Sequence, residues 1–336
     1  MAESTQERAR GALYGLAIGD ALGMPTQSLS RAEVVARYGP LVATFWPGPP
    51  GHPLASGLPA GTVTDDTEQA LLLGRLIVEG GGDVAAGELA GQLLAWEESM
   101  RARGSLDLLG PSSTRALAAL AAGADLDQAG RYGVTNGAAM RVTPVGVATP
   151  SDDPCLVDRV VGVSRITHNT GVALAGAAAV AAAVSAGVDG MPLPEAIALA
   201  TSAAASAAGR GHWVAGADVG ARITWAVGLV AGLGQDQLID TVYRLVGTSL
   251  ATQESVPAAF AVAAAAPDDP WLACRIAASL GGDCDTIAAM TGAICGACHG
   301  AEAFPRAARD TVASVNGLNL DALAADLLAV RAGAGK

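Results

Sequence analysis

Apolar residues recur at helical spacing along nearly the whole chain, whereas the strict alternation typical of strands is scarce. In the segment 7–24, Leu13, Leu16, Ala17 and Ala21 fall on one face of a helix. The pattern therefore predicts an all-α protein. Further helices are predicted at about 31–38, 71–78, 85–100, 113–122, 192–208, 217–232, 235–247, 254–265, 270–280, 286–301 and 319–332, with one or two more within 156–187.

Two local patterns refine this prediction near the N-terminus. Gly15, Gly19 and Gly23 recur every four residues, which favours close packing of that helix against another backbone. Ser30 and Glu33 have the spacing of a capping box at the start of the 31–38 helix.

The loop from Trp46 to Gly61 is dense in Pro and Gly and contains His52. It is either a surface connection or a lid over a site, and its position directly before an acidic helix start favours the lid. The chain has 336 residues, enough for one large domain or two ordinary ones. Without a long linker or an internal repeat, a single domain over 1–336 is predicted.

The amino-acid composition restricts the possible folds and the possible binding partners. The chain is 51% hydrophobic, 15% charged and 4% aromatic, so its core consists mainly of small aliphatic side chains that allow close helix packing. A net charge of −12 argues against a nucleic-acid polymer as partner, because phosphate backbones are bound by clustered Lys and Arg. A small phosphate-bearing ligand stays possible if metal ions or helix N-termini neutralise it.

The location of the protein is predicted from three features. The N-terminus lacks the pattern of a signal peptide. The run from Gly171 to Gly187 is mostly Ala and short for a membrane span, so a buried helix is predicted there and no membrane partner. Five cysteines in a chain of this size are typical of reduced thiols, which suggests a cytoplasmic protein.

Several familiar motifs are absent or misleading. The stretch Cys295 to His299 matches a c-type haem attachment pattern, but such attachment belongs to exported proteins, and here the stretch lies inside a predicted helix. No second Cys/His pair stands at zinc-ligand spacing. No Walker, dinucleotide-binding or Gly-x-Ser-x-Gly pattern is present.

Oxygen-bearing side chains gather at two predicted helix starts, Thr64 to Glu68 and Gly281 to Thr286. Each group could simply cap its own helix, but one cap needs only one such residue. If the two starts meet, they supply carboxylates and hydroxyls, which suit Mg²⁺, Mn²⁺ or Ca²⁺ better than Zn²⁺ or copper. Two such ions could orient the vicinal hydroxyls of a sugar and activate a water. The candidate metal ligands are Thr64, Asp65, Asp66, Asp283, Asp285 and Thr286.

Three further features stay open from the residues alone. Asp20 is an acid in an apolar stretch, either paired with a backbone amide or an Arg, or catalytic. The Gly-rich turn at Asn136 and Gly137 could present backbone N–H groups to an anionic or polyhydroxyl ligand. A lone His168 is more often a core histidine than a site residue.

Taken in order, five motifs resemble the signatures of the ADP-ribosylglycohydrolase family: Gly15 to Gly23, Thr64 to Thr67, Asn136 to Arg141, Thr167-His168, and Gly281 to Thr286. The resemblance covers a core of about 8–305, with the helix at about 319–332 beyond it. It implies a compact all-α orthogonal helical bundle with a binuclear magnesium or manganese site in a cleft. The family removes ADP-ribose from protein side chains and other acceptors.

The resemblance also implies roles for individual residues. It assigns two divalent cations, Mg²⁺ or Mn²⁺, to the six candidate ligands, with Asp65, Asp66 and Asp285 also catalytic. The residues that it implies for binding ribose and phosphates are Asn136, Gly137, Ala138, Met140 and Arg141, with His168 near the ligand.

One residue departs from the family pattern. Many members carry a Glu where this chain has Gln27, and an amide cannot exchange a proton at neutral pH. Gln27 is therefore expected to position substrate or water, and Asp65 or Asp66 to handle the proton. The expected function is metal-dependent hydrolysis of a ribosyl N-glycosidic bond in an ADP-ribosyl group on a protein or small molecule. The alternatives are a nucleoside hydrolase, which Gln27 favours, and a relative that binds ADP-ribose without turnover.

Overall fold

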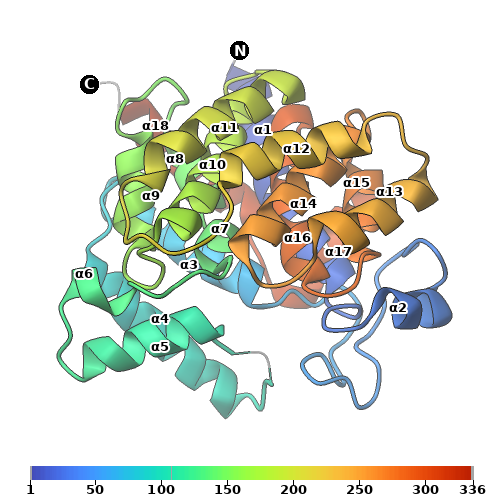
Figure 1. Ribbon diagram of the computed structural model, residues 1–336, viewed down its shortest axis with the longest axis horizontal. Coiled ribbons are helices and arrows are strands. Elements are labelled where there is room, and N and C mark those ends of the chain that lie inside the picture. The colour runs from blue at the N-terminus through green and yellow to red at the C-terminus, as the bar shows by residue number, and fades with distance from the viewer. Residues whose placement is uncertain (1, 107, 334–336) are drawn as a thin grey trace.

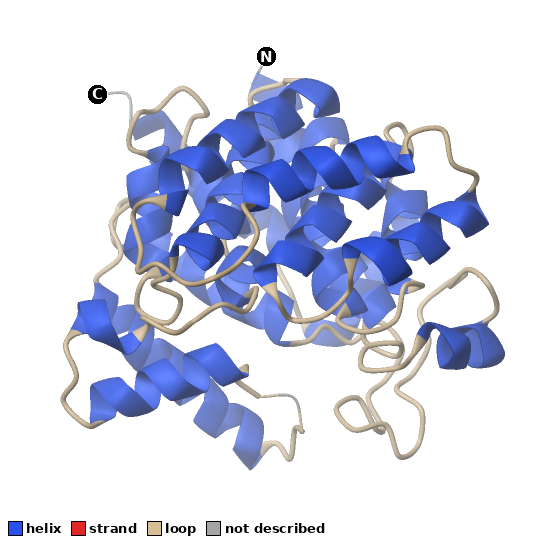
Figure 2. Cartoon of the chain, viewed as in Figure 1, coloured by secondary structure: helices blue, strands red, loops and turns tan. Residues whose placement is uncertain are grey.

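Two helices from opposite ends of the chain, α1 (Ala2–Gly23) and α16 (Cys284–His299), pack together at the centre of the molecule. The computed structural model describes residues 2–106 and 108–333. Apart from two isolated β-bridges, the described ranges contain helices and loops without strands (Figures 1 and 2). All the described α-helices except the short one at Leu126–Ala129 contribute to one hydrophobic core. The prediction of an all-α, single-domain fold is confirmed.

The remaining helices surround this pair (Figure 1). They are α2 (Arg31–Tyr38), α3 (Asp65–Glu79), α4 (Ala86–Ala102), α5 (Pro111–Ala121), α6 (Leu126–Ala129), α7 (Gly137–Arg141), α8 (Thr143–Ala148), α9 (Leu156–Ser164), α10 (Gly171–Val188), α11 (Leu193–Ala208), α12 (Val219–Val230), α13 (Gln235–Thr241), the π-helical turn η1 (Val242–Val246), α14 (Thr252–Ala265), α15 (Pro270–Ala278), the 3₁₀ turn η2 (Ala301–Ala303), α17 (Arg306–Asn316) and α18 (Leu320–Gly333).

The glycines of α1 bring its backbone directly against α16. A Cβ added at Gly15 would lie 2.0 Å from the carbonyl oxygen of Gly292, and one at Gly19 would lie 2.0 Å from that of Ala288. Only residues without a side chain allow this approach. The predicted close packing is therefore confirmed. We call this contact the glycine interface; it runs antiparallel and pairs Gly11, Gly15, Gly19 and Gly23 with Gly296, Gly292, Ala288 and Asp285, respectively.

Helix α10 is the apolar segment in which a buried helix was predicted. It is the one helix in the described ranges that is long and apolar enough to cross a membrane, and 89% of that window is buried inside the fold. Burial on all sides is typical of the central helix of a large α-helical core. The predicted buried helix is confirmed.

Most differences from the predicted helices occur where the apolar pattern is short. The capping box of Ser30 and Glu33 forms as predicted. Helix α17 was not predicted, because Ala308 and Val312 are the only residues that it buries. The short helices α6 and α8 were also missed, and the segment predicted as one helix over 235–247 divides into α13 and the turn η1.

Candidate active site

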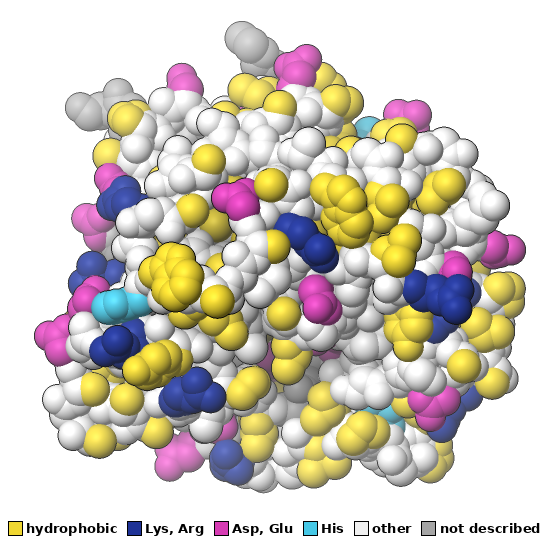
Figure 3. Space-filling model, viewed as in Figure 1, with side chains coloured by type: hydrophobic (Ala, Val, Ile, Leu, Met, Phe, Trp, Pro, Cys, Tyr) yellow, Lys and Arg dark blue, Asp and Glu magenta, His cyan; other side chains and the backbone are white. Residues whose placement is uncertain are grey.

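The helix starts that carry the acidic motifs open onto one pocket of about 560 Å³. Figure 3 shows a hollow below the centre of the molecule's face, and in Figure 1 the elements α4 and α5 lie to one side of this region and α2 to the other. The pocket is lined by Gln27, Ser28, Leu54, Asp65, Leu106, Leu108, Leu109, Gly110, Pro111, Ser113, Thr135, Asn136, Gly137, Met140, Thr248, Ser249, Leu250, Gly282, Asp283, Asp285 and Thr286.

Asp66 joins the two motifs directly. Its Oδ2 lies 3.2 Å from Thr64 Oγ1, at the start of α3, and accepts a hydrogen bond from Thr286 Oγ1, in the first turn of α16, also at 3.2 Å. The three side chains are buried. Segments more than half the chain apart thus place their oxygens within one cluster, and acids in a first helical turn are favoured by the helix dipole.

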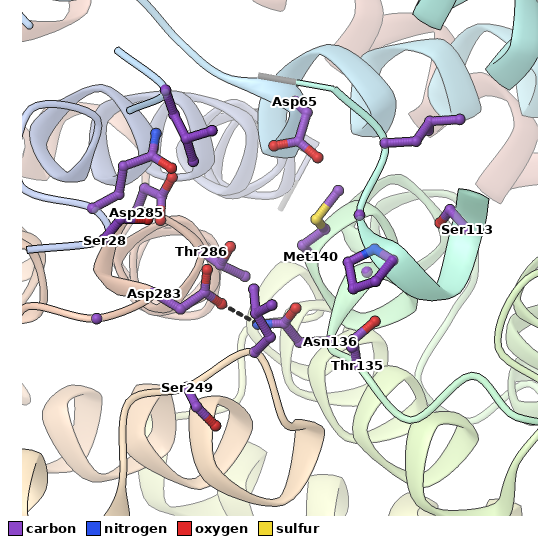
Figure 4. A pocket seen from close by; sticks show the side chains of 18 of the residues that line it. Ser28, Asp65, Ser113, Thr135, Asn136, Met140, Ser249, Asp283, Asp285 and Thr286 are labelled. Carbon is purple, nitrogen blue, oxygen red and sulfur yellow. Dashed lines mark hydrogen bonds between the residues drawn. The ribbon is translucent and has the colours of Figure 1, made fainter. Parts of the chain in front are cut away.

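The other three acids among the candidate metal ligands, Asp65, Asp283 and Asp285, face the pocket (Figure 4). Asp65 accepts a hydrogen bond from Gln69 Nε2 at 3.0 Å, which fixes one of its oxygens. Asp283 accepts from Asn136 Nδ2 at 2.5 Å, a contact that links the α16 start to the α7 start. Burial raises the pKa of Asp283 to about 6, and the hydrogen bond from Asn136 opposes that rise.

The donor set of the site consists of oxygen atoms, which bears on the cations that it could bind. In the described ranges, no three Asp, Glu, His or Cys side chains are grouped closely enough to hold an ion alone. The cluster instead combines carboxylates with the hydroxyls of Thr64 and Thr286, and it offers oxygen without sulfur or imidazole. Oxygen ligands of this kind fit Mg²⁺ and Mn²⁺. Whether the six predicted ligands bind metal stays a prediction.

Three predicted substrate-binding residues line the pocket, namely Asn136, Gly137 and Met140. Arg141, by contrast, lies behind the wall and is 1% exposed. Its guanidinium donates to Thr167 Oγ1 at 2.5 Å and to Gln69 Oε1 at 3.4 Å. Burial lowers the pKa of Arg141 to about 10, against the opposing charge of the Asp65 carboxylate. Direct contact between Arg141 and substrate phosphates is not supported by this geometry.

His168 and Ala138 are also absent from the lining. The His168 ring is fully buried between Thr135 Oγ1, 3.0 Å from Nε2, and Thr167 Oγ1, 2.7 Å from Nδ1. Burial, with the nearby Arg141 charge, holds the pKa of His168 well below its usual range. His168 does not line the pocket itself but supports Thr135, which does, and its position near the ligand stays a prediction.

Gln27 and the loop before α3 reach the pocket together. Gln27 is 5% exposed, and its Nε2 meets no acceptor among the described residues. The backbone carbonyl of Gln27 is 2.8 Å from Nε2 of His52, a buried residue of the Trp46–Gly61 loop. The same loop contributes Leu54 to the lining. Leu54 is the one described residue of this loop that lines the pocket, and the loop's role as a lid stays a prediction.

The sequence singled out Asp20 but left its role open, and it did not predict much of the apolar wall. Asp20 accepts hydrogen bonds from Thr64 and Thr67 at the start of α3. Burial raises the pKa of Asp20 to about 6, and the bonds from Thr67 and Thr64 oppose the rise. The pocket wall formed by residues 108–111 and Leu250 could not be predicted from the sequence. An apolar loop residue looks the same in sequence whether it lines a pocket or packs inside the protein. Cys295 and Cys298 of the haem-like pattern are buried in α16, where they pack as expected.

Comparison with known proteins agrees with this architecture. A family model described as ADP-ribosylglycohydrolase matches residues 1–336. The uncharacterized protein YegU of Escherichia coli (strain K12) is 36% identical over 327 residues, which cover 97% of this chain and 97% of that protein. An ADP-ribosyl-[dinitrogen reductase] glycohydrolase of Rhodospirillum rubrum is 32% identical over 171 residues, 49% of this chain and 53% of that protein.

A solved structure described as an ADP-ribosylglycohydrolase-related protein complex has the same fold. It matches with a TM-score of 0.73 and 26% identity, and the match covers 98% of this chain and 99% of that one. The family comprises hydrolases that act on glycosyl bonds. Sequence, fold and pocket lead to one assignment: this chain belongs to the ADP-ribosylglycohydrolase family.

Proposed function

We propose that this protein is a metal-dependent hydrolase that cleaves a ribosyl N-glycosidic bond, with an ADP-ribosyl group on a protein or small molecule as its substrate. One observation carries the proposal: the hydroxyl oxygens of Thr64 and Thr286 both lie 3.2 Å from Asp66 Oδ2, beside a pocket lined by three more acids. The name of the Rhodospirillum rubrum relative, an ADP-ribosyl-protein glycohydrolase, supports the ADP-ribosyl substrate.

The metal site would be held by Thr64, Asp65, Asp66, Asp283, Asp285 and Thr286. If bound there, two Mg²⁺ or Mn²⁺ ions would supply positive charge for orienting vicinal ribose hydroxyls and activating a water.

The side chains perform the remaining tasks. The carboxylates of Asp65 and Asp285 face the pocket and favour the positive charge that develops at the anomeric carbon during cleavage. The Asp65 carboxylate takes the proton of the attacking water, because Gln27 has no group that exchanges protons at neutral pH. The free N–H bonds of the Gln27 amide are available to hold a water or substrate oxygen.

Metal removal tests the proposal. Purified full-length protein is incubated with ADP-ribosyl-arginine, an ADP-ribosyl-serine peptide and a set of ribonucleosides, and release of ADP-ribose or ribose is measured. With Mg²⁺ or Mn²⁺, turnover of at least one substrate is expected. Excess EDTA should abolish it and added Mg²⁺ should restore it, because no Lys, Arg or His is among the described residues that line the pocket. Full activity in excess chelator, or tight binding of ADP-ribose without hydrolysis of any substrate, would contradict the proposal.

A second substrate class, an uncharged ribonucleoside, is favoured by the charge of the pocket. None of the described lining residues is Arg, Lys or His, and the charged ones are all acids. A diphosphate there would depend on ions and backbone amides alone. Much of the remaining lining is apolar, with Leu54, Met140, Leu250 and the 108–111 segment, which suits a neutral ring such as a nucleobase.

Substitution of Gln27 separates the two substrate classes. Gln27→Glu is expected to raise the ratio of kcat/KM for ADP-ribosyl over nucleoside substrates roughly 10-fold or more, because a carboxyl group can protonate a basic leaving group. Gln27→Met is the matched control, since it keeps the volume but has no proton to transfer. If the two variants have the same substrate ratio as the wild type, Gln27 does not select the substrate.

A further inference from the structure

Asp20 holds the start of α3 through four hydrogen-bond donors. Its carboxylate is fully buried. Oδ1 accepts from Thr64 Oγ1 at 2.8 Å, and Oδ2 accepts from Thr64 N at 2.9 Å, from Thr67 N at 3.1 Å and from Thr67 Oγ1 at 2.5 Å. Because all four partners donate, both oxygens of Asp20 serve as acceptors.

This arrangement replaces the usual cap of a helix. An N-cap side chain normally accepts the N–H of the second or third helical residue. Thr64 is the N-cap of α3, but its side chain makes no such bond, and the N–H of Thr67 is satisfied by Asp20 from α1 instead. The Thr64 hydroxyl is thereby released from capping.

The released hydroxyl has a defined orientation. A threonine hydroxyl carries one hydrogen and two lone pairs. The oxygen of Asp20 lies 2.8 Å away and the oxygen of Asp66 lies 3.2 Å away, so the shorter contact takes the hydrogen. The lone pairs of Thr64 Oγ1 are then left for the side of Asp66. Thr64 Oγ1 and Asp66 Oδ2 then face each other as acceptors 3.2 Å apart, and a cation bound by both oxygens would stabilise this arrangement.

The same helix also fixes the other half of the site. Gly19 and Gly23 flank Asp20, and they lie against Ala288 and Asp285 in the glycine interface. A Cβ on Gly23 would lie 2.2 Å from the Cα of Asp285. Helix α1 therefore sets the position of Thr64 relative to Asp285 with little freedom for adjustment.

We propose that Asp20 is a positioning residue for the metal site, which acts by taking the hydrogen of the Thr64 hydroxyl and turning its lone pairs toward the cation. The proposal rests on the metal-dependent function argued above. Asp20 itself does not touch the cation or the substrate. A purely structural role would instead affect stability without affecting the affinity for metal.

The test measures Mn²⁺ affinity by electron paramagnetic resonance, which does not depend on turnover. Asp20→Asn is expected to weaken Mn²⁺ binding about 10-fold to 100-fold, as is found when partners of metal ligands are replaced. The amide offers one acceptor oxygen in place of two, so its NH₂ group faces either the Thr64 hydroxyl or the donors that Oδ2 accepts in the wild type. An Asp20→Asn protein that is folded by circular dichroism and binds Mn²⁺ as the wild type does would overturn the inference.

Two further variants keep the test decisive if Asp20→Asn does not fold. Thr67→Val removes a donor to the same carboxylate but leaves the Thr64 hydroxyl bonded to Asp20. It should lower the thermal midpoint while the Mn²⁺ dissociation constant stays within about twofold, whereas Thr64→Val should weaken binding. Equal losses of affinity in Thr67→Val and Thr64→Val would show that Asp20 merely holds the helix start and would overturn the inference. A wild-type protein that binds no Mn²⁺ would instead overturn the proposed function.

Discussion

Asp285→Asn is expected to lower kcat/KM for the best substrate by on the order of 10³-fold, as replacement of a group that stabilises transition-state charge does in other enzymes. Asp285 is buried in the first turn of α16 and faces the pocket. The amide has the same shape but removes one negative charge, so it both weakens a divalent cation's site and stabilises the developing positive charge less. Mn²⁺ affinity and turnover should fall together, while the helix content stays unchanged.

The control for this substitution is Asp268→Asn. Asp268 is exposed in the loop before α15, and the change alters the net charge by the same amount. It should leave turnover and Mn²⁺ binding at wild-type values. An Asp285→Asn protein with wild-type turnover would rule out the proposed role of the α16 start.

Gly292→Ala is expected to lower the free energy of unfolding by about 3 kcal/mol or more, at the upper end of the cost of overpacking a core. Its Cβ would lie 2.0 Å from the carbonyl oxygen of Gly15. The obstructing atom belongs to the backbone of α1, so no side-chain rotation can relieve the clash and the two central helices must move apart. Urea unfolding followed by circular dichroism measures the change.

Gly91→Ala is the matched control, because it is the same substitution inside helix α4. A Cβ at Gly91 meets nothing within 4 Å. Alanine is the better helix former, so this variant should be more stable than the wild type by about 0.5–1 kcal/mol. If Gly292→Ala is as stable as Gly91→Ala, the backbone contact between α1 and α16 is not as close as described.

The features that could be predicted from the sequence depend on residue spacing along one helix, or on side chains that their own helix does not require. Four-residue glycine spacing indicated a close helix contact, and Ser30 with Glu33 indicated a cap. Two clusters of acids at helix starts suggested that they meet, because neither helix needs so many caps. Asp66, which bonds to Thr286, shows that they do.

The features that could not be predicted depend on the direction in which a side chain points after packing. Arg141 and Met140 are neighbours in sequence, yet Met140 faces the pocket and Arg141 points into the core toward Thr167. A five-residue helix such as α7 has too few positions to define a buried face. Asp20 was left open for a related reason: its partners, Thr64 and Thr67, lie on another helix.

The glycine interface also has a consequence for biosynthesis. During translation, α1 is complete long before α16 has been made, and until then its glycine face has no partner. Contacts between such distant segments form late, because a long loop must close before they add any stability. Since Thr286 belongs to α16, nascent or C-terminally truncated chains that lack α16 cannot bring Asp66 and Thr286 together, and they should lack the proposed cation site. Ion binding would then mark the chains that have finished folding.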